Sequence, residues 1–185
     1  MKSGKSLYVT AGAIALAAIT FSLAVSAQAQ TESTLYSFTG GTDGSSPVTG
    51  LISDSAGNLY GVAESGGNLS DCNGAGCGVV FELSPNGTGG WTQTVLHTFT
   101  GGTDGSFPNS ALLRDAAGNL YGTTSFGGNS TCSGGSSCGT VFELSPSSGG
   151  WAETILYRFT GGSDGWLPEG TLLMDASGNH FGTAS

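Results

Sequence analysis

The sequence has little charge of either sign, and very little positive charge. Only 9% of its 185 residues are charged, and four Lys and Arg residues stand against thirteen Asp and Glu residues. Two of the four basic residues, Lys2 and Lys5, lie close to the N-terminus. Because a chain of net charge −9 is repelled by phosphate backbones, we expect no nucleic-acid partner.

Long apolar runs and helical periodicity are missing beyond the first 29 residues. Residues 1–29 have the pattern of a secretory signal peptide, because Lys2 and Lys5 precede an apolar run from Leu7 to Val25 and a small-x-small cleavage signal at 27–29. The run is long for a signal peptide, so an uncleaved membrane anchor is the alternative. We expect cleavage, and a mature chain that is secreted or at the cell surface with no membrane contact.

Glycine, by contrast, is in large excess and recurs in a repeat. The 34 glycines far exceed the usual share of ~7%, and they fall at the same phase between short apolar runs. Phe38, Phe99 and Phe159 mark a period of about 60 residues. Glycines placed in this way predict turns between strands.

Each copy of the repeat contains short runs rich in β-branched and aromatic residues, which predict strands. A D-x-A-G-N turn separates the first two runs, and a Ser-Pro pair ends the third. The predicted strands are 50–53, 59–63, 79–83 and 91–99 in the first copy, 111–114, 120–124, 140–144 and 151–159 in the second, and 171–174 and 180–184 in the third. A further predicted strand at 34–38 matches the fourth run of the later copies.

Four antiparallel strands per repeat of ~60 residues predict an all-β fold of β-propeller-type blades. We assign residues 34–185 to this tandem region, with a strand at 34–38 from a preceding unit, blades at 47–99 and 108–159, and a partial blade at 168–185. An open β-meander or a sandwich is the alternative. About two and a half repeats form an incomplete ring, since closed propellers have about four to eight blades. We therefore expect a fragment of a longer array, or self-association through unpaired blade edges.

The recurring phrases G-N-L-Y-G, G-T-V-F-E-L-S-P and L-Y-S-F-T-G-G-T-D-G resemble the GloVer (Gloeo/Verruco) tandem repeat of exported bacterial proteins. The resemblance covers nearly everything after residue 33. It implies an extracellular, β-propeller-like array, often in larger proteins with varied C-terminal anchors. It brings no catalytic residues to this sequence.

The four cysteines form two pairs, Cys72 with Cys77 and Cys132 with Cys138, in the same loop of successive copies. In an exported chain, an even count in each repeat predicts one local disulfide per loop. Zinc ligation is the alternative, but pairs spaced this widely without a nearby His are poor zinc sites. We therefore expect two disulfides.

One Asp recurs in each G-G-[TS]-D-G phrase, as Asp43, Asp104 and Asp164. A calcium or glycan site on one rim is the functional interpretation, and an Asx-turn that shapes the bend is the structural one. Because calcium sites gather about six to eight oxygen ligands and each loop offers one carboxylate, the pattern favours the turn.

Aromatic residues after this phrase are the better candidates for binding a ligand at the surface. We equate Phe107 and Trp166 with the position that Ser46 holds in the first copy. The site therefore varies between copies, unlike Trp91 and Trp151, which recur and are expected to pack between blades. Aromatic side chains on a rim can stack on sugars.

The remaining candidates for chemistry are two His residues and two repeated Glu residues. His97 replaces a Tyr of the other copies and His180 replaces a Leu, so we interpret both as tolerated substitutions. Glu82 and Glu143 occupy equivalent places on neighbouring units, which favours a structural role over a glycosidase pair. We expect no catalytic residue, no metal and no cofactor.

These patterns predict an exported, non-catalytic β-propeller-type module that binds a glycan or protein partner through its loops. One alternative is a fragment of a larger extracellular glycan-active enzyme. Another is a purely structural array at the cell surface.

Overall fold

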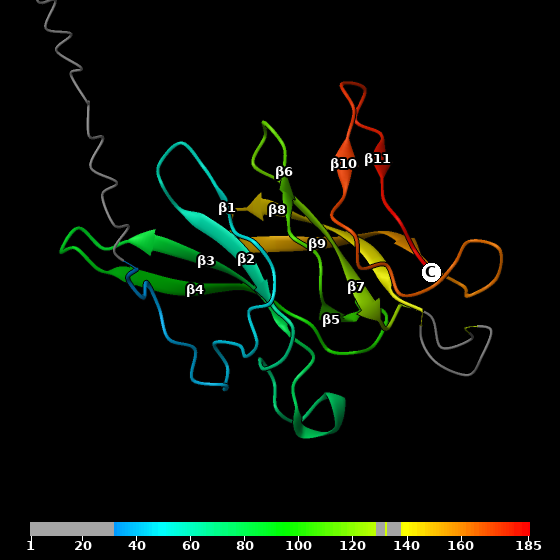
Figure 1. Ribbon diagram of the computed structural model, residues 1–185, viewed down its shortest axis with the longest axis horizontal. Coiled ribbons are helices and arrows are strands. Elements are labelled where there is room, and N and C mark those ends of the chain that lie inside the picture. The colour runs from blue at the N-terminus through cyan, green and yellow to red at the C-terminus, as the bar shows by residue number, and fades with distance from the viewer. Residues whose placement is uncertain (1–31, 129–131, 133–137) are drawn as a thin grey trace, which may run out of the picture. The chain divides into compact units, whose positions relative to one another are not determined.

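The first two copies of the repeat each form an antiparallel sheet, and the third forms a hairpin (Figure 1). The computed structural model describes residues 32–128, 132 and 138–185, and the predicted signal peptide at 1–29 lies outside them. Thr34–Ser185 form one compact unit. No helix in this described part of the chain is long and apolar enough to cross a membrane. The all-β prediction is confirmed.

The first sheet has the strand order β1-β2-β3-β4, and the second has β5-β7-β8-β9 with β6 paired to β7. The strands of the first sheet are β1 (Ile52–Ser53), β2 (Leu59–Ala63), β3 (Val79–Pro85) and β4 (Trp91–Thr98). Those of the second are β5 (Ser106–Pro108), β6 (Leu113–Arg114), β7 (Leu120–Phe126), β8 (Thr140–Ser147) and β9 (Gly150–Arg158). The C-terminal hairpin consists of β10 (Leu173–Met174) and β11 (His180–Phe181), and a 3-10 turn, η1 (Cys72–Gly74), lies between β2 and β3.

The Ser-Pro pair belongs to the third strand of the first two copies: β3 ends at Pro85, as the sequence predicts, and β8 continues one residue beyond Pro146 to Ser147. Pro85 pairs with Trp91 of β4, and Pro146 pairs with Trp151 of β9. The other neighbour of β3 pairs with it only as far as Leu83. The proline therefore lies where the strand has one partner, and strand positions of this kind tolerate a missing N–H.

Strand β5 is a strand that the sequence analysis does not predict. It pairs with the far end of β7, with Ser106 opposite Phe126 and Pro108 opposite Thr124. The same place in the first sheet holds only an isolated bridge between Ser45 and Ser65. A three-residue strand that contains proline has too few alternating residues to be recognised from sequence.

The predicted strand at 34–38 is wrong, because no described strand includes these residues. A strand needs a neighbour for its backbone hydrogen bonds, and no described strand pairs with this segment. Tyr36 and Phe38 instead pack on the face of the first sheet that is turned away from the second, here called its outer face. Phe38 meets Phe81 edge-on with ring centroids 4.9 Å apart. The apolar residues that suggested a strand serve to cover a sheet.

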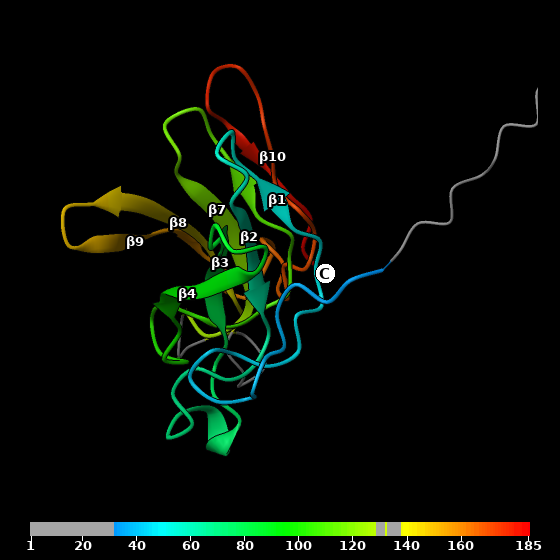
Figure 2. The same cartoon turned by 90° about the vertical axis from the view of Figure 1, so that its left-hand side faces the viewer.

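The D-x-[AS]-G-N turns are held together by their Asp. The Asp54 carboxylate accepts hydrogen bonds from the backbone and side-chain amides of Asn58 at 2.9 Å, and from the Tyr60 hydroxyl at 3.0 Å. Asp115 accepts the same three bonds in the second copy. Of these three bonds, Asp175 keeps the two from its Asn and lacks the third, because a Phe replaces the Tyr. The three turns lie side by side along one edge, in chain order (Figures 1 and 2).

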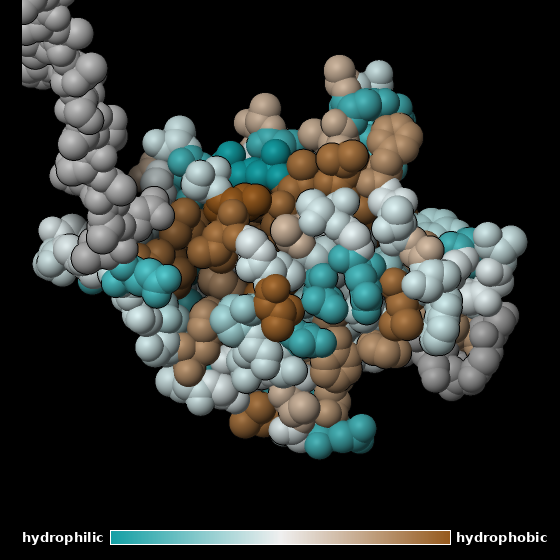
Figure 3. Space-filling model, viewed as in Figure 1, coloured by the Kyte–Doolittle hydropathy of each residue, from teal (hydrophilic) through white to brown (hydrophobic). Residues whose placement is uncertain are grey.

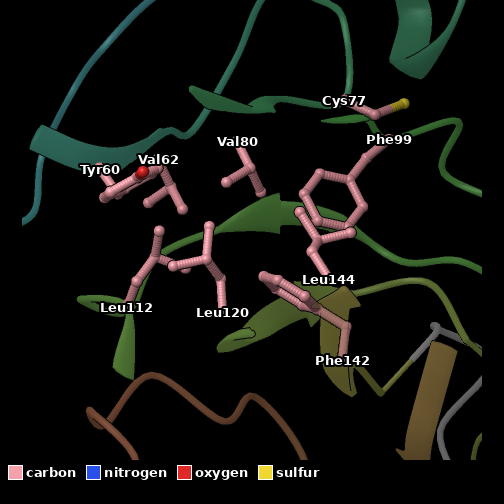
Figure 4. Close-up of a cluster of buried hydrophobic side chains, with 9 residues drawn as sticks. All are labelled: Tyr60, Val62, Cys77, Val80, Phe99, Leu112, Leu120, Phe142 and Leu144. Carbon is pink, nitrogen blue, oxygen red and sulfur yellow. The ribbon is translucent and has the colours of Figure 1, made fainter. Parts of the chain in front are cut away.

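The facing sides of the two sheets, here called their inner faces, pack around a shared hydrophobic core (Figure 4). Toward one end of this core the fully buried Phe99 meets Phe142, with ring centroids 5.2 Å apart. The other buried members are Tyr60, Val62, Cys77 and Val80 from the first copy, and Leu112, Leu120 and Leu144 from the second. The described residues form no closed ring.

The glycine of the G-N-L-Y-G phrase is required by this packing. At Gly122, a Cβ atom would lie 2.6 Å from Cζ of Phe142, which crosses over the glycine from the paired strand β8. Gly61 has the same relation to Phe81, with a separation of 2.9 Å. The recurring glycine therefore makes room for the recurring Phe of the F-E-L phrase.

Candidate functional site

Both predicted disulfides are present. Cys72 pairs with Cys77 across Cα atoms 5.3 Å apart, and Cys132 pairs with Cys138 across 5.7 Å. The first disulfide packs against the turn after β4, where a Cβ atom at Gly101 would lie 2.8 Å from Cys77 Sγ. The cysteines therefore connect a surface loop to the edge of the sheet and leave no free thiol for zinc.

The Asp residues of the G-G-[TS]-D-G phrase each hold the turn in which they lie. Asp43 accepts hydrogen bonds from the backbone N–H and the hydroxyl of Thr39. Asp104 and Asp164 accept the same pair from the equivalent Thr of their copies. The Thr hydroxyl is the main reason that the pKa of Asp164 falls to about 2, against a weaker opposing effect of desolvation. These contacts match the geometry of a turn-stabilising Asp.

A Tyr hydroxyl completes this turn at the first and third occurrences of the G-G-[TS]-D-G phrase but not at the second. Tyr36 donates to Asp43 at 2.9 Å, and Tyr157 donates to Asp164 at 3.0 Å. The second occurrence has His97, at the end of β4 in the first sheet, in place of the Tyr, and its Nε2 lies 3.9 Å from Oδ2 of Asp104. The turn therefore loses a hydroxyl donor and gains an imidazole.

His97 also faces a carboxylate from the neighbouring sheet. Its Nε2 lies 3.5 Å from Oε1 of Glu153 on β9. One ligand atom each of His97, Asp104 and Glu153 lie within 4.8 Å of one another. We call these residues the inter-sheet trio. It brings together a His interpreted as a tolerated substitution, a turn Asp, and a Glu that the sequence analysis does not single out.

Burial dominates the electrostatics of the inter-sheet trio. It lowers the pKa of His97, and the nearby Asp104 works in the opposite direction. Burial also raises the pKa of Glu153 to about 7, with Asp104 adding to the shift and Arg158 opposing it. Nε2 of His97 and Oε1 of Glu153 are buried and have no hydrogen-bond partner. Leaving buried polar atoms unpaired costs about 1–3 kcal/mol each.

The equivalent positions one repeat earlier provide a matched comparison for the trio. Its equivalent residues are Tyr36, Asp43 and Gln93. The Gln93 side-chain amide donates to the backbone carbonyl of Asp43 at 3.0 Å, and Tyr36 donates to the Asp43 carboxylate. The side chains of Tyr36 and Gln93 therefore both donate hydrogen bonds. In the trio, His97 and Glu153 stand in place of these two donors, and both are groups that ligate metals.

Phe107 and Trp166 do not share one repeat position, so that prediction is wrong. Ser46, Phe107 and Leu167 are the equivalent residues, because all three have a left-handed backbone with φ of 57°, 55° and 47°. Phe107 is half-buried, and its ring lies edge-on to Phe126. Trp166 has 45% of its surface exposed and corresponds to Ser106. Of the two aromatic candidates, Trp166 is the exposed one.

The outer face of the second sheet forms a pocket of about 740 Å³ with the C-terminal hairpin. Its lining includes Val141, Leu156, Phe159, Leu172 and His180, and also Asp164. Leu156 is 41% exposed, and Phe181 and Leu173 of the hairpin are 56% and 70% exposed. Figure 3 shows apolar residues gathered on one side of the molecule, from the region of β1 and β2 toward β10.

Neither the pocket nor the inter-sheet trio is predicted by the sequence analysis. Both depend on which surfaces the second sheet turns toward its neighbours. For the trio, one signal was available: aligning the copies shows Tyr replaced by His and Gln replaced by Glu in corresponding phrases. The alignment alone does not reveal that the two replacements meet, because they come from different copies.

A family model for the Gloeobacter/Verrucomicrobia repeat matches residues 7–185. The match includes both sheets, the pocket and the inter-sheet trio, and it confirms the resemblance drawn from the recurring phrases. No curated protein matches the sequence.

Proposed function

Since the chain belongs to the Gloeobacter/Verrucomicrobia repeat family, we propose that it is an exported, non-catalytic β-propeller-type module. We propose further that it binds a protein partner at the pocket beside the C-terminal hairpin. The partner contributes an extended strand that carries Phe and Leu two residues apart. Such a strand adds to the free edge of β11, in the manner of peptides that extend a sheet.

The observation that carries this proposal is the correspondence between the pocket wall and a buried surface of the same chain. Val141, Leu156 and Phe159 are the repeat equivalents of Val80, Leu96 and Phe99. Those residues of the first sheet lie in or against the core that the second sheet covers. The pocket wall therefore has the composition of a surface that packs against another repeat unit.

The same correspondence defines what fills the pocket. In the core between the sheets, the F-E-L phrase of β8 supplies Phe142 and Leu144 against the equivalent wall. Phe142 pairs with Gly122 and Leu144 with Leu120 of the strand beside them. On the hairpin the corresponding partners are Gly182 and His180, and β11 has only β10 as a described neighbour. A partner Phe opposite Gly182 enters the pocket.

Binding of a synthetic peptide tests the proposal directly. The probe is a labelled G-T-V-F-E-L-S-P octapeptide, measured by fluorescence anisotropy against the chain. We expect saturable binding that is lost when the peptide Phe is replaced by Ala. Leu156→Asp in the pocket wall abolishes binding, whereas Leu69→Asp, at a residue 47% exposed in the loop before η1, leaves it unchanged. Equal binding of the Phe and Ala peptides contradicts the proposal.

A glycan ligand is the second candidate, favoured by the exposed Trp166. Its neighbour Gly165 lines the pocket, and the backbone of Trp166 is paired with Ser185, another lining residue. An indole held at the rim of a pocket is suited to stacking on a sugar ring. A glycan-array signal that disappears in Trp166→Ala, together with an absence of peptide binding, would identify the ligand as a glycan and not a protein.

A further inference from the structure

We propose that His97, Asp104 and Glu153 bind a divalent transition-metal ion of the zinc type, which joins the first sheet to the second. The three ligands come from β4, from the turn that follows it and from β9 of the next sheet. The site is independent of the pocket and of any partner bound there.

The geometry is close to that of a three-ligand zinc site. Zinc binds imidazole nitrogen and carboxylate oxygen at about 2.0–2.2 Å, so ligand atoms around one ion lie about 3.3 Å apart. The separations from His97 Nε2 are 3.5 Å to Glu153 Oε1 and 3.9 Å to Asp104 Oδ2. Small side-chain rotations close this difference.

The unpaired atoms of the trio point to a missing partner. Nε2 of His97 and Oε1 of Glu153 are both buried without a hydrogen bond, and they face each other rather than water. Two carboxylates at this spacing also repel. Arg158 lies close enough to affect Glu153, but its Nε donates to the carbonyl of Thr103 at 3.2 Å. A cation between the three groups satisfies both orphan atoms and offsets the repulsion.

The repeat itself argues against an accidental cluster. One repeat earlier, the equivalent Tyr36 and Gln93 both donate hydrogen bonds to Asp43. At the trio, His97 replaces this Tyr and Glu153 replaces this Gln, so both donors are lost at one interface. Each replacement introduces a group that ligates transition metals. Neither His97 Nε2 nor Glu153 Oε1 makes a hydrogen bond in place of those that are lost.

The ligand chemistry selects the kind of ion. Calcium takes about six to eight oxygen ligands, and the trio supplies one nitrogen and two carboxylates. Imidazole with carboxylates suits zinc and its neighbours in the transition series. Three protein ligands leave a fourth position for water, as in open zinc sites.

Equilibrium dialysis of the untagged chain against ZnCl2 tests the site. We expect one saturable Zn²⁺ per chain, and a melting temperature that rises with the metal. His97→Tyr combined with Glu153→Gln rebuilds the Tyr, Asp and Gln set that occurs one repeat earlier. We therefore expect this double variant to retain the fold and to lose the saturable Zn²⁺ binding. His180→Leu, which installs the residue of the other copies, removes the other imidazole and leaves Zn²⁺ binding unchanged.

Two further variants keep the test decisive if the double variant folds poorly. Glu153→Gln alone is nearly isosteric, and it weakens Zn²⁺ binding at least tenfold. Tyr36→His combined with Gln93→Glu creates the same three ligand types around Asp43, one repeat earlier. This variant raises the stoichiometry of bound Zn²⁺ toward two per chain. An absence of saturable Zn²⁺ binding, or binding that is equal in the wild-type chain and in Glu153→Gln, overturns the proposal.

Discussion

The first and second sheets are built from the same repeat but differ in what covers them. Both faces of the first sheet are covered, the inner by the second sheet and the outer by Tyr36 and Phe38. The outer face of the second sheet is covered only in part, so Phe159 stays partly exposed where Phe99 is fully buried. The difference shows that one repeat sequence yields either a buried core or a partly exposed apolar face, depending on its neighbour.

The comparison is sharpest for the repeated Phe at the end of the fourth run. Phe99→Ala removes a fully buried ring from the shared core, and we expect it to cost about 3–5 kcal/mol. Phe159→Ala removes the equivalent ring from a half-covered face, so we expect less than half of that cost. Urea unfolding of the two variants measures both values. Equal costs mean that the outer face is covered in solution.

The recurring glycines give the second contrast. Gly122→Ala places a Cβ atom against the ring of Phe142, which is held in the core, and we expect a loss of about 1–3 kcal/mol. At Gly182 the nearest atom is the far end of the flexible Leu172 side chain, at 2.9 Å. Gly182→Ala is therefore expected to change stability by less than about 1 kcal/mol. Thermal unfolding ranks the two variants, and the reverse order contradicts the packing described here.

Removing one disulfide has a smaller expected effect. Cys72→Ser with Cys77→Ser frees a loop with a sequence separation of 5, which costs about 2 kcal/mol on the chain-entropy estimate. We expect the double variant Cys132→Ser with Cys138→Ser to lose about the same free energy of unfolding, because these cysteines have a sequence separation of 6. Urea unfolding in the absence of reductant makes the comparison. A variant as stable as the wild type shows that the loop is constrained by other contacts.

The smallest expected effect is a pH dependence from the D-x-[AS]-G-N turns. Burial acts to raise the pKa of Asp115, but hydrogen bonds from Asn119 and Tyr121 outweigh it, so the pKa lies below the ordinary value of 3.8. A carboxylate with a lowered pKa contributes stability that is fully present above about pH 4 and is lost as the pH falls through the folded pKa. We expect unfolding measurements to show a decline below pH 4, and a shallower decline in Asp115→Asn. If stability falls as steeply with pH in Asp115→Asn as in the wild type, other carboxylates cause the pH dependence.

Much of the fold was predictable because the same local sequence patterns occur in more than one copy of the repeat. Strands β2, β3, β4, β7 and β8 begin at the predicted residues, and both disulfides are local pairs within one loop. The strand predicted at 34–38 was wrong because an apolar, aromatic run looks the same whether it pairs with a strand or lies across a sheet. Strand β5 was missed because its pairing depends on β7, a partner that the local sequence does not reveal.

The sequence by itself determined the period, the all-β class, the turns and the disulfide pairs. These features depend on residues close together in the chain, such as Asp54 with Asn58, so local chemistry decides them. Only the tertiary structure decided which faces are covered and which residues meet between sheets. Glu153 comes within 3.5 Å of His97 only because the second sheet packs against the first. Contacts of this kind join distant parts of the chain, and no short-range pattern encodes them.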